Sequence, residues 1–397
     1  MLELPSWPFF TQEEAYKVSE VLLSNKVNYW TGTEGREFER EFADFVDSDY
    51  AIAVANGTVA LDLALKAFDI AEGDEVIVTS RSFLASVSSI INAGAVPVFA
   101  DVDRDSQNIT PATARRVISS KTRAIVCVHL AGWPCDMDGF IELAGEFNLK
   151  IIEDCAQAHG AKYRGLDGVA RSVGSIGHIG AWSFCQDKIM TTGGEGGMVT
   201  TNDKQLWQKM WSFKDHGKSF ETVYNKEHPP GFRWLHESFG TNWRLTEMQS
   251  AIGRIQLTQM PDWTARRTLN SAALAKVCRK FDFLRVPEVP SNIEHAYYKF
   301  YVFVEPERLI AELTRDSIIE VVNAAGIPCM QGSCSEVYLE KAFDNHPSRP
   351  EKRLPIAQEL GETSLMFLVH PTITNPQMKE ICDQLESALL SFQAKFL

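Results

Sequence analysis

The chain has 397 residues, of which 45% are hydrophobic and 23% are charged, and this balance is typical of a globular protein long enough for two domains. Its 39 basic and 52 acidic residues give a formal net charge of −13, which disfavours nucleic acid or a membrane as partner but leaves an anionic small molecule open. Because the sequence shows neither a basic, apolar leader nor a long apolar run, we expect a cytoplasmic protein without a transmembrane helix.

Two helices are predicted before the first strand. Residues 9–23 form an amphipathic pattern with Thr11 as the N-cap and two glutamates in the first turn, as helix starts favour. Residues 35–46 place three phenylalanines on one face at spacings of four and three. Such a stripe is more typical of a core than of a ligand site.

Short apolar runs then alternate with helical patterns. The predicted strands cover residues 51–54, 75–78, 95–100, 124–128 and 150–153, and the predicted helices cover residues 55–68, 83–93, 110–118 and 136–147. This alternation with short joins predicts right-handed βαβ units around a mostly parallel, buried sheet. Ligands of such sheets bind at the carboxyl ends of the strands.

The pattern weakens after residue 202. Residues 202–239 are predicted to be an irregular lid or substrate loop, and residues 245–257 a helix that begins a connection to a second domain. A strand at 299–304 and helices at 307–325 and 375–392 follow. We expect a large cofactor-binding domain with an N-terminal arm at 1–255 and a small C-terminal domain at 256–397.

Reactive residues are concentrated between residues 151 and 197. Asp154 follows the short strand of KIIEDCAQAHGA, while Ser183 and Lys188 lie in GAWSFCQDKIMTTGGEGG. These are the residues that pyridoxal 5'-phosphate (PLP) requires: a lysine amine for a Schiff base with its aldehyde, and a carboxylate that keeps the pyridine nitrogen protonated. Read singly, the lysine would be a solvated loop residue and the aspartate a helix cap; their combination favours the cofactor.

The remaining cofactor contacts are predicted from position. Gly57 and Thr58 stand where a strand gives way to a helix, and with the Ser183 hydroxyl they would bind the phosphate. Phe83 could lie flat on the pyridine ring, and Gln157 could hydrogen-bond the phenolic oxygen. The plain alternatives are a helix cap, a core phenylalanine and a surface glutamine.

Metal binding is not predicted. The eight cysteines are scattered through apolar surroundings and form no CxxC pair, and no matching cysteine or histidine pair provides a zinc pattern. We expect reduced thiols.

Four motifs together resemble the DegT/StrS family of sugar aminotransferases. They are GTVALDLAL, IIEDCAQAHGA, the SFCQDK segment with GGEGG behind it, and GTNWRLTEMQSAIG, and the similarity runs from about Trp30 to His370. The resemblance implies the α/β architecture of fold type I PLP-dependent transferases, the aspartate aminotransferase fold. Its large domain has a mostly parallel mixed sheet, and its smaller C-terminal domain is α+β.

The resemblance also implies residue roles. Lys188 would carry the cofactor and Asp154 would pair with the pyridinium, while Gln157 would contact the ring oxygen and Phe83 would stack. Gly57, Thr58 and Ser183 would bind phosphate.

The same resemblance implies a homodimer with shared active sites. Asn242 would reach the phosphate of the neighbouring subunit's cofactor. The plain alternative for Asn242, which precedes a predicted helix, is an N-cap.

The implied activity is transfer of an amino group from L-glutamate to a nucleotide-linked keto sugar, with pyridoxamine phosphate as the intermediate cofactor form. A 4-keto sugar on UDP or dTDP is the expected acceptor, and the amino sugar would serve surface polysaccharide or glycan biosynthesis. The alternatives are a PLP-dependent sugar dehydratase of the same fold, a cyclitol or amino-shikimate type transaminase, and a non-catalytic PLP-binding regulator. Lys188 favours transamination, because a deoxygenating branch of the family has histidine there.

Overall fold

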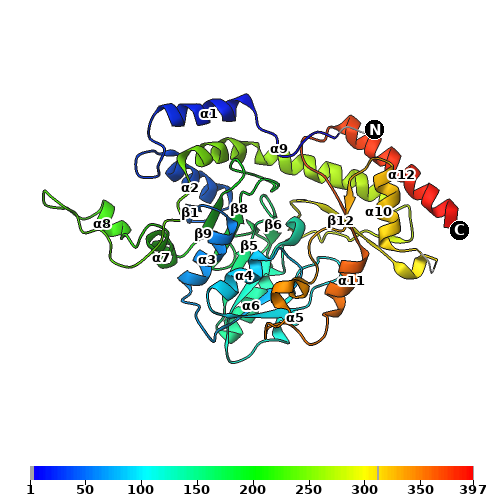
Figure 1. Ribbon diagram of the computed structural model, residues 1–397, viewed down its shortest axis with the longest axis horizontal. Coiled ribbons are helices and arrows are strands. Elements are labelled where there is room, and N and C mark those ends of the chain that lie inside the picture. The colour runs from blue at the N-terminus through cyan, green and yellow to red at the C-terminus, as the bar shows by residue number, and fades with distance from the viewer. Residues whose placement is uncertain (1–3, 311–312, 397) are drawn as a thin grey trace.

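A seven-stranded sheet lies at the centre of the larger lobe of the computed structural model (Figure 1), which describes residues 4–310 and 313–396. The strand order is β1-β9-β8-β5-β4-β2-β3. Neighbours from β8 to β3 are parallel, whereas β9 runs antiparallel to both β8 and β1. The strands are β1 (Tyr50–Val54), β2 (Glu75–Thr79), β3 (Val96–Ala100), β4 (Thr122–Val128), β5 (Lys150–Asp154), β8 (Ile179–Ser183) and β9 (Gly197–Thr201).

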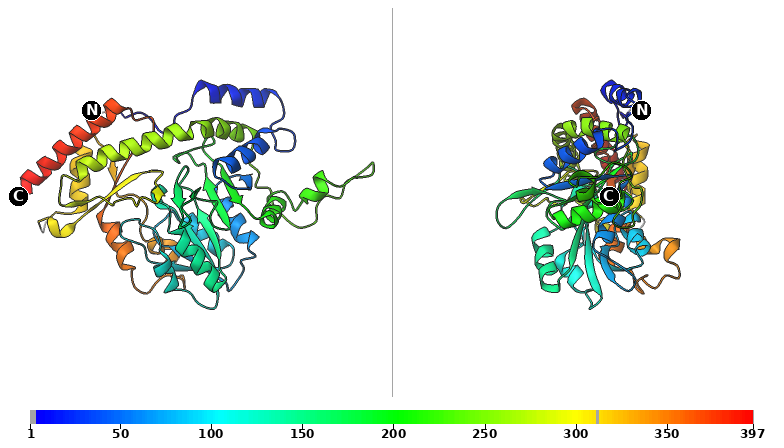
Figure 2. Two further views of the ribbon diagram at one scale, coloured as in Figure 1. Left: turned by 180° about the vertical axis from the view of Figure 1, so that it is seen from behind. Right: turned by 90° about the vertical axis from the view of Figure 1, so that its left-hand side faces the viewer.

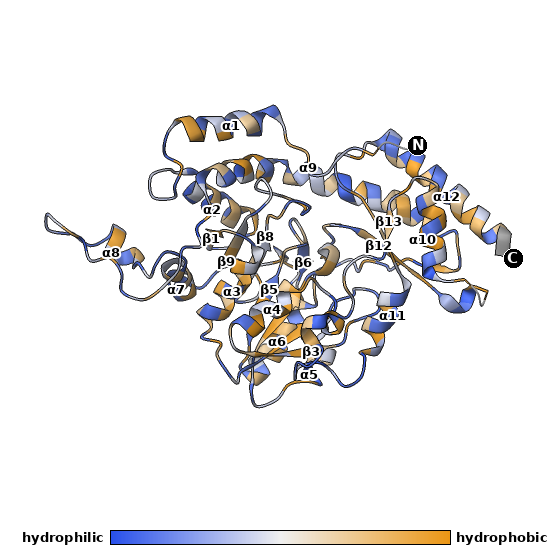
Figure 3. Cartoon of the chain, in the orientation of Figure 1, coloured by the Kyte–Doolittle hydropathy of each residue, from blue (hydrophilic) through white to orange (hydrophobic). Residues whose placement is uncertain are grey.

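Helices cover both faces of this sheet because successive strand residues point to opposite sides. On β2, Val76 and Val78 pack in the cluster that contains α3 and α4, whereas Ile77 packs in the cluster that contains α6. Figure 3 shows the strands beneath α6 in the hydrophobic colour. The helices of this lobe are α2 (Glu34–Phe45), α3 (Gly57–Ala67), α4 (Ala85–Asn92), α5 (Pro111–Arg115), α6 (Met137–Phe147), α7 (Lys204–Lys214) and α8 (Phe220–Tyr224).

The smaller lobe contains a four-stranded antiparallel sheet in the order β10-β12-β14-β13. Its elements are β10 (Leu284–Arg285), β12 (Phe300–Val304), β13 (Cys329–Met330), β14 (Ser364–Phe367), α10 (Arg315–Ala324), α11 (Pro355–Thr363) and α12 (Asn375–Phe396). A third sheet joins β11 (Ile293–Glu294), β6 (Lys162–Arg164) and β7 (Ala170–Ser172). Short 3-10 turns are η1 (Leu130–Gly132), η2 (Pro306–Arg308), η3 (Val337–Leu339) and η4 (Lys341–Phe343).

Helix α9 (Glu247–Cys278) runs across both lobes, and α1 (Gln12–Leu23) lies along it (Figures 1 and 2). The prediction that this helix ends at residue 257 is wrong: it continues through Pro261 for 32 residues in all. A proline inside a helix costs about 3 kcal/mol, which the burial of residues such as Met260 and Leu274 on both sides of it offsets. The boundary predicted between residues 255 and 256 falls inside α9, and the division into two domains stays a prediction.

Two other predicted elements need correction. Residues 202–239 are not irregular throughout, because Asp203 caps α7 by accepting hydrogen bonds from the backbone of Gln205 and Leu206. The predicted helix 307–325 is shorter: α10 begins after Thr314, which forms a capping box with Ser317. Residues 311–312 of that prediction lie outside the described residues.

A hairpin-like projection, which we call the arm and define as residues 218–239, leaves the larger lobe after α7 (Figures 1 and 2). It contains α8 near its base, and its outgoing and returning segments are joined by an isolated antiparallel bridge between Lys218 and His236. Among the described helices, none is long and apolar enough to cross a membrane.

Candidate active site

Lys188 lies on a turn just beyond β8. The turn is held by a hydrogen bond of 3.1 Å from the backbone N–H of Lys188 to the carbonyl of Cys185. Trp7 adds a hydrogen bond of 2.9 Å from its indole N–H to the carbonyl of Lys188. The Lys188 Nζ atom lies 5.1 Å from the ring centroid of Tyr298, so the N-terminal segment and the second half of the chain both help to position the amine.

Asp154 is the last residue of β5, and the residue is 5% exposed. Its Oδ2 atom accepts a hydrogen bond of 2.7 Å from the Ser86 hydroxyl, and its Oδ1 atom accepts one of 3.1 Å from the backbone N–H of Ala156. Two donors therefore fix the carboxylate at the carboxyl end of a central strand. A carboxylate has room for further donors, so it can also accept a protonated ring nitrogen.

Gln157 is buried, so the alternative of a surface glutamine is wrong. Its Oε1 atom accepts a hydrogen bond of 2.8 Å from the backbone N–H of Ala131. Because the oxygen is engaged there, the Nε2 group is left as a donor, which is what a phenolate oxygen requires.

The start of α3 forms a tight cradle beside Ser183. Asn56 is the N-cap, and its side chain accepts a hydrogen bond of 3.0 Å from the N–H of Val59. A Cβ atom on Gly57 would lie 2.5 Å from the Cβ and 2.9 Å from the Oγ of Ser183. The Gly57 and Thr58 N–H groups belong to the first turn, where the helix provides no acceptor and an anion is favoured.

Phe83 is 69% exposed, so the alternative of a core phenylalanine is wrong. It precedes α4, and its carbonyl accepts a hydrogen bond from the N–H of Ser86, the residue that contacts Asp154. A large exposed apolar ring on the turn that also carries Ser86 is suited to cover the face of a planar ligand.

Asn242 is not a helix cap. The N-cap of α9 is Thr246, which forms a capping box with Gln249. Asn242 lies in an extended segment, paired through its backbone with Asp215, and its side chain is exposed and makes no hydrogen bond to any described residue. The following residues run beside the end of β1, where the Trp243 carbonyl accepts from the N–H of Ala55, so Asn242 is at the same sheet edge as the α3 cradle.

Several cations surround Tyr298 without an equal number of anions. Lys299 Nζ is 4.8 Å from the Tyr298 ring centroid, on the ring that Lys188 also faces. Burial, opposed by Asp187 and assisted by Arg267 and Lys188, lowers the pKa of Lys299 to about 8. The site is therefore locally positive although the whole chain is acidic.

A buried cluster of His129, Glu153 and Cys155 has ligand atoms within 4.8 Å of one another. Both oxygens of Glu153 are already engaged, by His129 Nε2 at 3.0 Å and by the backbone N–H groups at Gly174, Ile176 and Gly177. Burial would raise the pKa of the Glu153 carboxyl, but these hydrogen bonds outweigh it and hold the pKa below its usual range. The cluster therefore supports the loop before β8 rather than offering free ligand positions.

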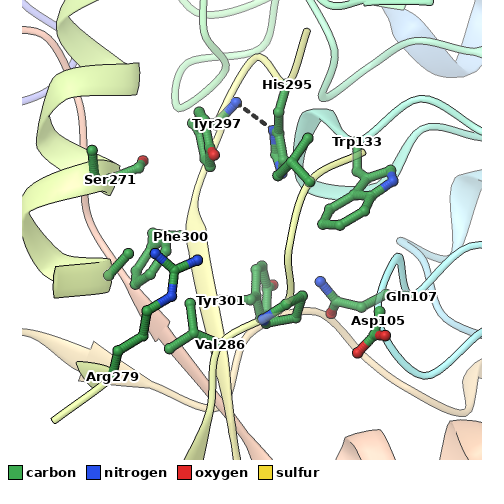
Figure 4. A pocket seen from close by; sticks show the side chains of 14 residues that line it. Asp105, Gln107, Trp133, Ser271, Arg279, Val286, His295, Tyr297, Phe300 and Tyr301 are labelled. Atoms are coloured by element: carbon green, nitrogen blue, oxygen red, sulfur yellow. Dashed lines mark hydrogen bonds between the residues drawn. The ribbon is translucent and has the colours of Figure 1, made fainter. Parts of the chain in front are cut away.

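A separate cavity of about 250 Å³ lies between the lobes (Figure 4). Trp133, His295 and Tyr297 line one side of it, and Arg279 and Ser271 line the side of α9. None of the eight predicted site residues lines it.

Three described residues of the site were missed by the sequence analysis: Ser86, Tyr298 and Trp7. No motif marks them, because a serine in a helix or a tyrosine in an apolar strand region has no chemical signature in sequence. They are recognised only when Asp154 and Lys188 are placed in space.

The fold and the edge at which these side chains meet define an aminotransferase of the aspartate aminotransferase fold. The chain belongs to the DegT/DnrJ/EryC1/StrS aminotransferase family, whose model matches residues 8–386.

Individual proteins agree with this assignment. The chain is similar to the aminotransferase from Psychrobacter cryohalolentis in its crystal structure, with 61% identity, a TM-score of 0.95 and coverage of 98% of this chain and 99% of the other. It is 34% identical to GDP-perosamine synthase of Escherichia coli O157:H7, covering 95% of this chain and 96% of that protein. It is 32% identical to dTDP-3-amino-3,4,6-trideoxy-alpha-D-glucose transaminase of Streptomyces venezuelae, covering 96% of each. The names of the Escherichia coli and Streptomyces venezuelae relatives are those of enzymes of nucleotide-linked amino sugars.

Proposed function

We propose that the protein binds PLP at the carboxyl edge of the large sheet and uses it to aminate a keto sugar carried on a nucleoside diphosphate. Lys188 would hold the aldehyde carbon, Asp154 the ring nitrogen, and Gln157 the phenolic oxygen. Gly57, Thr58 and Ser183 would receive the phosphate, and Phe83 would cover the ring. When bound, PLP supplies an electron sink for the carbon that loses or gains a proton.

The observation that carries this proposal is the convergence of complementary groups at one edge. A buried carboxylate, a glutamine with its N–H₂ group free to donate, a helix N-terminus and a lysine come from three separate segments, since the carboxylate and the glutamine follow the same strand. Each matches one functional group of the cofactor. The protein's own part in the reaction is then to hold the ring and to move a proton at the Lys188 amine once that amine is released.

For the substrates, we propose L-glutamate as donor and a 4-keto hexose as acceptor. The locally positive surroundings of Lys188 and Lys299 support an anionic donor. The relatives from Escherichia coli and Streptomyces venezuelae carry GDP and dTDP in their names. UDP, dTDP and GDP are therefore all to be tested as the nucleotide. We further propose a homodimer in which Asn242 reaches the partner's cofactor phosphate; the exposed, unbonded side chain of Asn242 supports this.

Borohydride reduction in the presence of PLP, followed by peptide mapping, tests the cofactor assignment. The label is expected on Lys188, and a label on another lysine would contradict the proposal. Lys188→Ala should abolish turnover while the fold survives, since a loop lysine contributes little to stability. Asp154→Asn should reduce the rate on the order of a hundredfold or more, as loss of a key electrostatic group does.

The substrate assignment is tested in two half-reactions. Glutamate should convert the cofactor from its aldehyde to its amine form, which is followed by absorbance, and a panel of UDP-, dTDP- and GDP-linked 4-keto and 3-keto sugars should reverse the change. A response only to keto compounds without a nucleotide would instead support the cyclitol or amino-shikimate type activity.

A further inference from the structure

The cavity between the lobes is walled by aromatic rings (Figure 4). His295 and Tyr297 stack face to face, with ring centroids 3.9 Å apart, and Trp133 meets His295 edge to face at 5.5 Å. Phe300 and Tyr301 of β12 also line the cavity. A ligand inside would therefore contact flat apolar surfaces, to which aromatic rings bind well.

Two buried side chains of the lining have polar groups that are free to bind a ligand. Ser271 is 1% exposed, and its Oγ atom has no hydrogen-bond partner among the described residues. Gln107 is 4% exposed, and its Oε1 atom accepts hydrogen bonds of 3.0 and 2.8 Å from the Arg81 guanidinium, which leaves the Nε2 group to donate. Figure 4 shows Ser271 and Gln107 on opposite sides of the cavity. Because buried polar groups are normally paired, both call for an oxygen acceptor inside the cavity.

The opening of the cavity carries a positive charge. Arg279 is exposed and lines the cavity, and it forms no ion pair with a described residue. The acidic side chain of the lining, Asp105, is already paired with Arg285. Burial raises the pKa of Tyr297, and the Arg279 guanidinium opposes this shift, so the cation acts on the aromatic wall. An anionic group on a ligand would complement it.

The aromatic wall has a strained backbone. Tyr297 has a φ of 47°, in the left-handed region that bulky residues rarely adopt. Its N–H donates a 2.8 Å hydrogen bond to His295 Nδ1, and the N–H of Tyr298 donates one of 2.8 Å to the carbonyl of Ala131. Strain of this kind is often retained at ligand sites. Here it accompanies a segment that places Tyr297 in the cavity lining and Tyr298 beside Lys188.

The volume of the cavity favours a small ligand. A dry cavity of about 150 Å³ already takes benzene, whereas pockets for drug-sized ligands have about 300–1,000 Å³. A cavity of about 250 Å³ therefore holds one ring with short substituents. Donors on opposite sides favour a ring that carries oxygen at both ends, and the unpaired guanidinium favours a carboxylate as one of them.

We propose that this cavity is a second ligand site, separate from the cofactor site, and that it binds a single-ring aromatic carboxylate with a further oxygen on the ring. Ser271, Gln107 and Arg279 are the donors to its oxygen atoms. This part of the inference is independent of the proposed function.

Occupation of the cavity also acts on the lysine. Residues 295–298 contact the ligand through Tyr297 and Lys188 through Tyr298. A bound ligand therefore restrains the segment that positions the amine, and it opposes the movement of that amine when it is released. This second part rests on the proposed function.

Calorimetry tests the binding directly. The probe is 4-hydroxybenzoate, titrated into the PLP-loaded protein, and a ligand of this size should bind with a Kd of about 1 mM or tighter. Benzoate lacks the second oxygen and 4-hydroxybenzyl alcohol lacks the charge, so each should bind about threefold to tenfold more weakly. No binding of 4-hydroxybenzoate at about 10 mM would overturn the proposal, and equal affinity for all three compounds would overturn the assignment of the donors.

Variants locate the ligand. Ser271→Ala and Arg279→Gln should each weaken binding about threefold to tenfold, as the loss of one hydrogen bond does, whereas Lys276→Gln changes an exposed lysine of α9 outside the lining and should leave it unchanged. Because the Ser271 hydroxyl has no partner in the free protein, Ser271→Ala should keep its thermal stability, which shows that the fold is intact. If both variants bind as tightly as Lys276→Gln, the ligand lies elsewhere and the proposal is wrong.

The half-reaction with glutamate tests the restraint on Lys188. Saturating 4-hydroxybenzoate should lower the limiting rate about fivefold or more, a coupling of the usual size, with little change in the glutamate concentration that gives half of that rate. Arg279→Gln should need a correspondingly higher ligand concentration for the same effect. A ligand in the active site would instead raise the glutamate requirement and leave the limiting rate unchanged, which would overturn the cavity assignment. An unchanged rate and an unchanged glutamate requirement in the ligand-saturated protein would overturn the restraint.

Failure of the proposed function gives a different result. If the native protein shows no half-reaction with PLP and glutamate, the proposed function fails, while titration of the protein as isolated still decides the cavity. If the half-reaction proceeds but 4-hydroxybenzoate does not bind, the function stands and the inference about the cavity is wrong.

Discussion

Gly57→Ala tests the cradle between α3 and β8. The new Cβ atom would lie 2.5 Å from the Cβ and 3.1 Å from the Cα of Ser183, contacts too close for a side-chain rotation to relieve. Overpacking of this kind costs about 1–3 kcal/mol. Alanine in a helix gains up to about 0.5–1 kcal/mol over glycine, so we expect a net loss of roughly 0.5–2 kcal/mol in the free energy of unfolding.

Gly145→Ala is the matched control, because Gly145 is an exposed helical glycine in α6 and a Cβ there meets nothing within 4 Å. That variant should gain up to about 0.5–1 kcal/mol from helix propensity alone. Urea unfolding of the cofactor-free protein compares the two variants, and a PLP titration followed by absorbance compares their affinity for the cofactor. Gly57→Ala should bind PLP more weakly, since Ser183 and the first turn of α3 must move apart.

A double variant identifies the cause. Gly57→Ala with Ser183→Gly removes the Cβ and Oγ atoms that the alanine meets, so stability should recover relative to a Ser183→Gly reference, while PLP affinity stays low for lack of the hydroxyl. If Gly57→Ala is as stable as Gly145→Ala and binds PLP normally, the close approach of these two segments and its role in phosphate binding are both refuted.

Three further changes are expected to be informative. Because burial lowers the pKa of Lys299 to about 8, the unfolded chain binds the extra proton between about pH 8 and pH 10.4, so this residue makes stability rise with pH in that window. Lys299→Met should remove this rise of about 3 kcal/mol in urea unfolding, whereas Lys352→Met, at an exposed lysine, should leave it unchanged. Glu247→Gln should cost about 1 kcal/mol in thermal unfolding, since the Glu247 carboxylate accepts two backbone N–H groups at the start of α2; no shift would show that water caps the helix equally well. Glu153→Gln should cost on the order of 3 kcal/mol, because an amide N–H₂ group would face buried N–H donors, and a loss below 1 kcal/mol would contradict the structural role of this carboxylate.

The sequence by itself determined the alternation of strands and helices in the larger lobe. Short apolar runs and capping residues are local signals, so the strand end at Asp154 and the N-cap at Thr11 are where the sequence places them. The motif with Lys188 before a glycine-rich turn can also be recognised in the local sequence. The family match confirms the family resemblance that this motif helped to indicate.

Only the tertiary structure decided which distant residues meet. Local patterns indicated a helix that ends at residue 257, but α9 continues through Pro261 because packing along both lobes outweighs the missing hydrogen bond. Ser86 beside Asp154 and Tyr298 beside Lys188 depend on the order of strands in the sheet and on the approach of the smaller lobe. Such contacts join segments far apart in the chain, and no short-range pattern specifies them. The exposure of Phe83 and of the arm's aromatic rings was decided in the same way, because the sequence alone does not show which apolar side chains the fold leaves exposed.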